Sequence, residues 1–392
     1  MYEKVINIFK EITKIPHCSG NTEKLQEFIE NYAKKRGFIV FRDKAGNILA
    51  YKDTPKLALQ SHIDMVCVGD APKIEIIEEN GYLKAKNSTL GADNGIGVAI
   101  MLAFMDEYTD IEYLFTNDEE IGLIGAKNLE FNIKAPYLLN LDSEDDSEII
   151  IGCAGGVDAK IKYPIKKEKI FGSLGDISIT NLPGGHSGVD IHKNIPNAIV
   201  ELLFKIDSIA YIKGGERRNS IPSNAYAKEV FDGEEEIEVY KSDYLEFLRK
   251  LPHGVLEYDF EFKIPSKSIN FALIDEDKII LSARANSNEK LNEIKEYILA
   301  KTFGCEVLFE DEYPAWRPEK NKLALKLQEI TNAKLNVIHA GLECAILKNK
   351  FPNVAMASYG PKIENPHSIR ERVDLGSVKR VIENVEKLIN QI

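Results

Sequence analysis

Residues 111–122, IEYLFTNDEEIG, contain the pattern that decides both the fold and the position of the site. An apolar run suited to a buried β-strand ends directly in three consecutive carboxylates, Asp118, Glu119 and Glu120. Like charges a few ångströms apart repel, and one of them would ordinarily take up a proton. Most acidic clusters are solvated turns, so a turn is the ordinary interpretation. The alternative is a site that holds something positive.

The bulk composition restricts the classes of protein to consider. A chain of 392 residues predicts two domains, and 44% hydrophobic with 29% charged residues is typical of a soluble globular protein. The net charge of −12 and the absence of a Lys/Arg-rich run argue against a nucleic-acid partner. No stretch is long and apolar enough to cross a bilayer. We therefore expect neither nucleic acid nor membrane as a partner.

The N-terminus and the cysteines predict a cytoplasmic protein. Residues 1–17 mix charges with apolar residues, unlike a signal peptide. The cysteines are scattered, odd in number and form no Cys-x-x-Cys pair, so reduced thiols are expected. They are Cys18, Cys67, Cys153, Cys305 and Cys344.

Apolar runs alternate with helical patterns on both sides of the opening stretch. Residues 56–66 (KLALQSHIDMV), 111–116 and 137–142 (YLLNLD) are predicted strands, and 96–105 (IGVAIMLAFM) a helix. This alternation indicates an α/β domain with a largely parallel sheet.

The pattern changes after GCAGG (152–156), where segments such as DAKIKYPI and GDISITNL predict strands that are less completely buried. The first pattern returns near the C-terminus, with a helix at 322–331, a strand at 354–359 and a final helix at 376–392. We therefore predict a catalytic domain made of residues 1–156 and 314–392, interrupted by an inserted α+β domain at 157–313.

Polar residues collect where the apolar runs of the first domain end. In open parallel sheets the ligand crevice lies at the carboxyl ends of the strands, so these residues are expected to share one crevice. Taken singly, an Asp ahead of a helix is a cap and an Asp after a strand starts a turn. Taken together, two imidazoles and several carboxylates are ligands that zinc prefers, and spacing alone leaves both interpretations open. The residues are His62, Asp64, Asp93, Glu119, Glu120, Asp142 and His367.

These residues lie in motifs that resemble those of the aminoacyl-histidine dipeptidases, also called Xaa-His dipeptidases or peptidase D. That family belongs to a wider di-zinc group that includes aminoacylases and carboxypeptidase G. Each motif is short, but their order along nearly the whole chain is specific. The motifs are SHIDMV, LGADNGIG, DEEIGLIGA, NLDSE with GCAGG, GGHSGVDIHK, RNSIP, HAGLECAIL and GPKIENPHSIRERV.

The resemblance implies a di-zinc exopeptidase domain with a lid domain inserted in it. It also implies two Zn²⁺ ions per chain, for which Co²⁺ or Mn²⁺ could substitute. One ion would be held by His62 and Asp142 and the other by Glu120 and His367. Asp93 would bridge both ions, with a cis peptide bond to the next residue.

The same resemblance assigns the catalytic roles. Glu119 would be the general base and acid, Asp64 would orient His62, and His186 of the inserted domain would polarise the scissile carbonyl. Because side chains alternate along an extended segment, Glu119 and Glu120 are expected to point to different sides. Two cations beside these glutamates would remove the repulsion noted at the outset.

Three residues are candidates for substrate binding. Arg284 follows an apolar strand and would pair bidentately with a substrate carboxylate, or else form a surface ion pair. Asn219 of RNSIP would help to hold the substrate. Glu343 of HAGLEC would lie near a pocket for the amino group, or else have a structural role.

The sequence thus predicts a cytoplasmic metallopeptidase that hydrolyses dipeptides, with Xaa-His substrates such as β-Ala-His favoured and a homodimer formed through the lid. One alternative keeps the fold but changes the substrate, to a broad-specificity di- or tripeptidase or an N-acyl-amino-acid hydrolase. Another is a non-catalytic peptide- or metal-binding protein. The presence of Glu119 together with a suitable residue at all five ligand positions argues against this second alternative.

Overall fold

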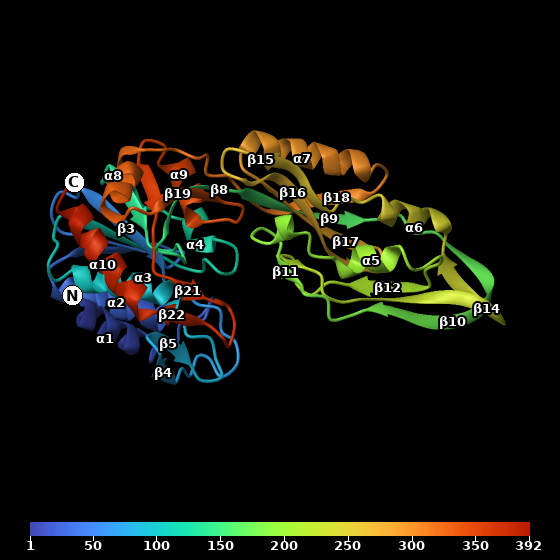
Figure 1. Cartoon of the computed structure of the whole chain (residues 1–392), viewed down its shortest axis with the longest axis horizontal. Coiled ribbons are helices and arrows are strands. Elements are labelled where there is room, and N and C mark those ends of the chain that lie inside the picture. The colour runs from blue at the N-terminus through green and yellow to red at the C-terminus, as the bar shows by residue number, and fades with distance from the viewer. The chain divides into compact units, whose positions relative to one another are not determined.

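The computed structural model describes residues 1–392, which form two compact units (Figure 1). Unit 1 comprises Met1–Gly152, Pro318–Asn336 and Leu342–Ile392, and unit 2 comprises Cys153–Arg317 and Val337–Gly341. The sequence placed the boundaries after residues 156 and 313, and did not anticipate the return of 337–341 to unit 2. None of the helices combines the length and the apolar composition that a bilayer crossing requires.

Unit 1 is built on an eight-stranded mixed sheet in the order β1-β2-β6-β3-β7-β20-β8-β19. The four central strands β6, β3, β7 and β20 are parallel, whereas β1 pairs antiparallel with β2, β2 with β6 and β8 with β20. The largely parallel sheet is therefore parallel in its centre, where the buried runs LALQSH and IEYLFT lie side by side. The strands are β1 Ile39–Arg42, β2 Ile48–Tyr51, β3 Leu57–His62, β6 Ile111–Thr116, β7 Tyr137–Asn140, β8 Glu148–Cys153, β19 Lys334–Ile338 and β20 Ala355–Ser358.

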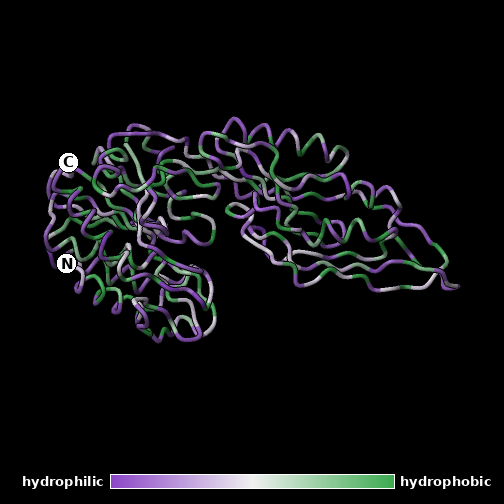
Figure 2. The backbone as a smooth tube through the Cα atoms, viewed as in Figure 1, coloured by the Kyte–Doolittle hydropathy of each residue, from purple (hydrophilic) through white to green (hydrophobic).

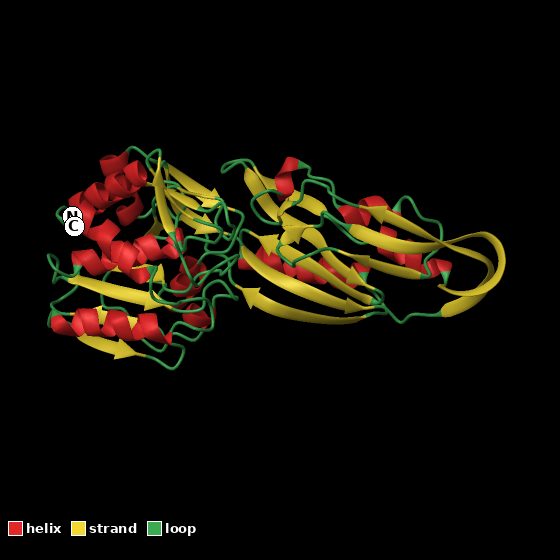
Figure 3. Cartoon of the chain, turned by 90° about the horizontal axis from the view of Figure 1, so that it is seen from below, coloured by secondary structure: helices red, strands yellow, loops and turns green.

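Helices pack around this sheet, as the red ribbons of Figure 3 show. On α1 the apolar residues Val5, Ile6, Phe9 and Ile12, spaced as on one face of a helix, are buried, and hydropathy alternates along this helix in Figure 2. By contrast α3 is buried on every side, since it packs against both α1 and β3. The helices are α1 Tyr2–Ile12, α2 Glu23–Lys35, α3 Ala92–Phe104, α4 Ile124–Lys127, α8 Lys322–Thr331, α9 Glu343–Lys350 and α10 Leu375–Ile389.

A second, four-stranded sheet of unit 1 joins two segments that are far apart in sequence. Its order is β21-β22-β5-β4, with β22 antiparallel to β5. The loop between β21 and β22 carries His367, so this small sheet fixes the base of that loop. The strands are β4 Ile76–Glu79, β5 Tyr82–Ala85, β21 Ile363–Glu364 and β22 Arg372–Asp374.

Unit 2 has the α+β character expected from its sequence. Its main sheet runs β10-β14-β12-β16-β17-β9-β18, with β15 paired to β16, and the pairs between these strands are antiparallel. Buried residues of α5, α6 and α7 share one apolar core with these strands. The elements are β9 Gly155–Lys162, β10 Lys167–Ile179, β11 Gly185–His186, η1 Ile191–Lys193, α5 Ala198–Leu203, β12 Tyr211–Gly214, β13 Ser220–Ile221, β14 Ala225–Tyr240, α6 Ser242–Arg249, β15 Gly254–Asp259, β16 Ile264–Asp275, β17 Lys278–Ala285, α7 Asn288–Lys301 and β18 Glu306–Tyr313.

The prediction that all cysteines are reduced is wrong for one pair. Cys18 and Cys67 form a disulfide across 49 residues of sequence, while Cys153, Cys305 and Cys344 form no disulfide. Neither spacing nor composition marks this pair. It arises because the segment after α1 packs against the segment after β3, where Met65 N–H donates to His17 O and Ser19 N–H to Met65 O.

Candidate metal centre and active site

The predicted ligand residues converge in unit 1. His62 is the last residue of β3, Asp93 lies in the first turn of α3, and Asp142 follows β7. Glu120 follows β6, and His367 lies in the loop between β21 and β22. Parallel strands bring their carboxyl ends to one edge of the sheet, which is why residues so distant in sequence meet.

Asp93 occupies the middle of this cluster. Its Oδ1 lies 3.1 Å from His62 Nε2 and its Oδ2 lies 3.1 Å from His367 Nε2. Asp142 Oδ1 lies 3.4 Å from the same nitrogen of His62, and Glu120 Oε1 lies 2.9 Å from the same nitrogen of His367. The residues thus form two groups that share Asp93, and each group could hold a metal ion.

The donor set fits zinc-class ions. Each group offers one imidazole nitrogen and two carboxylates with ligand atoms within 4.8 Å of one another, and zinc binds nitrogen and oxygen donors of this kind. The predicted cis peptide bond between Asp93 and Asn94 is confirmed. Asn94 Nδ2 donates to Leu141 O at 3.1 Å and also to the Asp142 carboxylate.

The electrostatics of the cluster are those of a site for cations. Burial raises the pKa of Glu120 to about 7 and holds the pKa of Glu119 well above its ordinary value, with the charge of Glu120 adding to the effect on Glu119. Burial disfavours the charged form of His367, but Asp93 and Glu120 outweigh it and raise the pKa to about 11. Protons therefore supply the positive charge in the metal-free protein. Metal binding would displace them.

Asp64 contacts both His62 and the turn that carries Glu119 and Glu120. Its Oδ1 is 3.5 Å from His62 Nδ1, which also lies 3.0 Å from the main-chain oxygen of Asp64. Its carboxylate accepts the N–H groups of Glu119 at 2.9 Å and Glu120 at 3.3 Å, and the Ser19 hydroxyl at 2.7 Å. One carboxylate thus contacts a predicted ligand histidine and the turn that carries the two glutamates. Nothing in the sequence marked Ser19.

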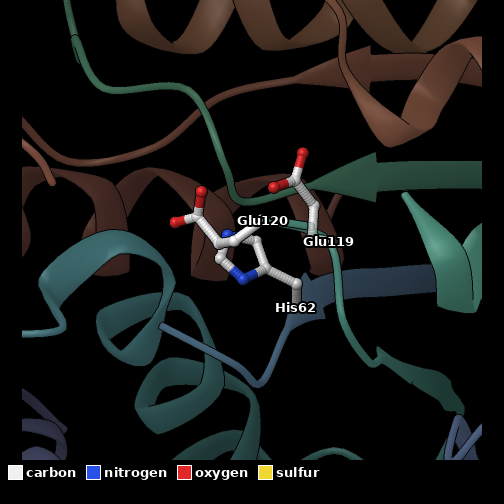
Figure 4. A group of neighbouring side chains, drawn as sticks. All are labelled: His62, Glu119 and Glu120. Atoms are coloured by element: carbon white, nitrogen blue, oxygen red, sulfur yellow. The ribbon is translucent and has the colours of Figure 1, made fainter. Parts of the chain in front are cut away.

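The turn itself differs from the expectation for an extended segment. The strand ends at Thr116, and Asp118 has a positive φ of 51° with its carboxylate accepting Gly20 N–H at 2.6 Å. Glu119 and Glu120 both come within 4.8 Å of His62 (Figure 4). Both carboxylates therefore reach His62, and the regular alternation of side chains does not extend to them, because the strand ends at Thr116.

Glu343, at the start of α9, is completely buried against the strands β3 and β6. Its Oε2 accepts hydrogen bonds of 2.6 Å from both Gln60 and Thr116. Gln60 is in turn bound by Asn140 at 2.6 Å. These contacts match a structural role, which was one of the two alternatives for Glu343.

Two further carboxyl groups near the cluster were not singled out from the sequence, although both lie in the quoted motifs. Burial raises the pKa of Glu144 to about 8, with Asp93 and Asp142 contributing. Glu371 is buried and accepts several main-chain N–H groups of the segment that carries Asp93. Their position a few residues after a predicted ligand, Asp142 or His367, is the only sequence signal that could have identified them.

The other predicted residues lie in unit 2. An added Cβ at Gly188 would lie 3.2 Å from both Arg284 Nε and His186 Cε1, so these two side chains meet at this glycine. Arg284 Nη1 donates to Tyr313 at 2.7 Å, while its Nε is buried and has no hydrogen-bond partner. The Arg284 guanidinium is therefore not the surface ion pair that was the alternative. Asn219 is exposed, and its main-chain oxygen accepts Ser187 N–H at 2.8 Å.

Comparisons with known proteins show the family of this chain. Residues 58–391 match the model of "Peptidase family M20/M25/M40". The chain is 30% identical to the cytosol non-specific dipeptidase of Escherichia coli over 98% of its own length and 97% of the relative. An aminoacylhistidine dipeptidase structure from Vibrio alginolyticus matches with a TM-score of 0.82 and 28% identity, covering 99% of this chain and 96% of the other.

A tripeptidase structure from Staphylococcus aureus shares the fold at a TM-score of 0.65 and 19% identity, covering 99% and 98% of the two chains. The match to the family model includes every predicted ligand position, from His62 to His367. The chain therefore belongs to peptidase family M20/M25/M40 and is a hydrolase.

Proposed function

We propose that this protein is a two-zinc dipeptidase that favours Xaa-His substrates. The observation that carries the proposal is the division of the Asp93 carboxylate between His62 and His367, each of which has a further carboxylate beside it. The names of the Escherichia coli and Vibrio alginolyticus relatives support a dipeptide as the substrate. The histidine preference follows the Vibrio protein's name and the motif resemblance.

The two ions would be held by His62 with Asp142 and by Glu120 with His367, with Asp93 shared. When bound, such ions supply Lewis acidity toward the scissile carbonyl and lower the pKa of a bound water. Asp64 keeps His62 in one orientation through its contacts at Nδ1, which fixes the ring nitrogen left for the metal.

Glu119 is the proposed proton shuttle. Its carboxylate lies beside His62 and Glu120 but belongs to neither of the two groups that share Asp93. It is therefore available to accept a proton from the attacking water and to pass it to the leaving amine. Its burial and the neighbouring negative charge favour a protonated carboxyl, which suits the second of these transfers.

His186 and Arg284 of unit 2 are proposed to bind the substrate. Both Gly188 and Val189 donate their N–H groups to His186 Nδ1, at 3.2 and 3.1 Å, which leaves the proton on Nε2 for donation to the scissile carbonyl. Arg284 Nε is unpaired, so the guanidinium has capacity for a substrate carboxylate. Residues 157–313 would then act as a lid, with Asn219 assisting near His186.

A broad dipeptidase is the second candidate, favoured by the "non-specific" name of the Escherichia coli relative. That name also supports a cytoplasmic location. A homodimer through unit 2 is proposed from the resemblance. The exposed side chains of Phe171, Phe260 and Phe303 supply apolar surface on that unit for such a contact.

The test is a substrate panel combined with elemental analysis of the same preparation. β-Ala-His, Gly-His, Leu-Gly, a tripeptide and an acetylated amino acid separate the candidate activities. We expect two zinc-class ions per chain, loss of activity on chelation and the highest kcat/KM on an Xaa-His dipeptide. Full activity without bound metal would end the proposal. Equal rates on Gly-His and Leu-Gly would favour the broad dipeptidase. A sample that sediments as a monomer would contradict the proposed homodimer.

A further inference from the structure

The carboxylate of Glu371 is bound by four consecutive main-chain N–H groups. Its Oε2 accepts from Leu90 at 2.7 Å and Gly91 at 3.1 Å, and its Oε1 accepts from Ala92 at 2.8 Å and Asp93 at 3.3 Å. The side chain is buried, with 2% of its surface exposed. These donors belong to the segment that enters α3, where helical N–H groups have no partner within the helix. An anion at this end of a helix is favoured.

This contact joins the segments that carry two predicted metal ligands. Asp93 is one of the four residues bound, and His367 lies four residues before Glu371 in the same loop. Gly91 has a φ of 70°, and Asp93 and Asn94 depart from helical geometry. The local sequence therefore does not hold Asp93 by regular helix hydrogen bonds. The buried carboxylate of Glu371 supplies the missing constraint from 278 residues away in sequence.

We propose that Glu371 is a positioning residue that holds Asp93 where its two carboxylate oxygens face His62 and His367 separately. The inference rests on the proposed two-metal function. A glutamine here would keep the size of the side chain but offer one acceptor oxygen, and its amide group would face N–H donors. Two of the four hydrogen bonds would become donor–donor contacts, and the Asp93 segment would lose its fixed position.

The alternative is that Glu371 only caps α3. A cap would affect stability without a selective effect on the metal sites. Glu364 provides a matched control, because it lies in β21 at the base of the same loop and its carboxylate pairs with Arg372 at the surface. Glu364→Gln makes the same chemical change seven residues earlier in the chain, with no contact to the Asp93 segment.

The experiment titrates metal-free wild type, Glu371→Gln and Glu364→Gln with Zn²⁺ by calorimetry, and with Co²⁺ by visible absorption. We expect Glu371→Gln to bind at least one ion about 10- to 100-fold more weakly, as is typical when a partner of a ligand is lost. Its Co²⁺ spectrum should also change, and excess Zn²⁺ should restore part of its activity. Glu364→Gln should behave as wild type.

Unchanged affinities and spectrum in a folded Glu371→Gln would overturn the inference. If this variant does not fold, Glu371→Asp is measured in its place. Aspartate keeps the negative charge, but its shorter side chain does not reach the four N–H groups as glutamate does. A wild-type Zn²⁺ affinity in Glu371→Asp would equally overturn the positioning role. A wild-type protein that binds fewer than two ions contradicts the proposed function instead. The two failures are therefore distinguishable.

Discussion

Glu119 and Glu120 are neighbours of the same chemical type, yet their surroundings differ. Glu120 Oε1 lies 2.9 Å from His367 Nε2 and shares a group with Asp93. Glu119 shares a group only with His62 and Glu120 itself. Position relative to Asp93, and not residue type, therefore distinguishes the proposed ligand from the proposed base.

Replacing each glutamate by glutamine tests this distinction. Glu119→Gln should keep both metal ions and still bind dipeptide, but lose at least roughly 10²-fold in kcat, as expected for a lost general base. Glu120→Gln should lose one metal equivalent and recover part of its activity with added Zn²⁺. Metal content and kcat of both variants are measured side by side. Metal loss in Glu119→Gln with retention in Glu120→Gln would reverse the assignment, and retention of metal and activity in both would make the cluster an ordinary turn.

At the scale of elements, the buried Glu343 carboxyl ties α9 to β3 and β6 through Gln60 and Thr116. Burial raises its pKa from 4.5 to about 7, with the charge of Asp142 contributing to the increase. Between these pH values the folded protein keeps a proton that the unfolded chain has lost. The free energy of unfolding therefore falls as pH rises through this window.

We predict that Glu343→Gln reduces this fall. The raised pKa of the wild-type carboxyl corresponds to a fall of at most about 3 kcal/mol in the free energy of unfolding between pH 4.5 and pH 7. A neutral amide does not titrate, so it contributes no such fall. Denaturant unfolding of the metal-free wild type and variant at pH 5 and pH 8 measures the difference. Glu364→Gln, whose carboxyl lies in a surface ion pair, serves as the control. An equal pH dependence in Glu343→Gln and wild type would contradict the prediction.

At the scale of the whole molecule, the proposed chemistry draws on both units. The predicted metal ligands and Glu119 belong to unit 1, while His186 and Arg284 belong to unit 2. A long insertion that carries side chains for the substrate would couple domain closure to catalysis.

His186→Ala should therefore lower kcat by about 10²-fold, the scale expected for loss of one donor to a developing oxyanion. Its metal content should equal that of wild type, because no predicted ligand lies in unit 2. Kinetics on Gly-His with parallel elemental analysis check both expectations. His192→Ala, which removes an exposed imidazole of the same unit, is the matched control. An unchanged kcat in His186→Ala would refute the role of this histidine.

The amino-acid sequence by itself determined the α/β class, the central strands and several of the helices of unit 1, and the chemical types of the site residues. Local patterns suffice for this, because burial repeats every two residues in a strand and every three to four in a helix. The stripe on α1 and the buried runs of β3 and β6 were recognisable for that reason. The strand β14 and the first part of β10, before GDISI, were missed because much of their length is exposed and polar, and so has no such signal.

Only the tertiary structure decided which residues touch. The disulfide Cys18–Cys67, the bond from Ser19 to Asp64 and the binding of the Asp93 segment by Glu371 join residues 45 to 281 positions apart. Such contacts depend on how strands and loops pack, and a local pattern contains no information about them. The sequence could thus predict that His62, Asp93 and His367 are suited to bind metal. The packing of distant segments determined that the two oxygens of Asp93 face the two histidines separately.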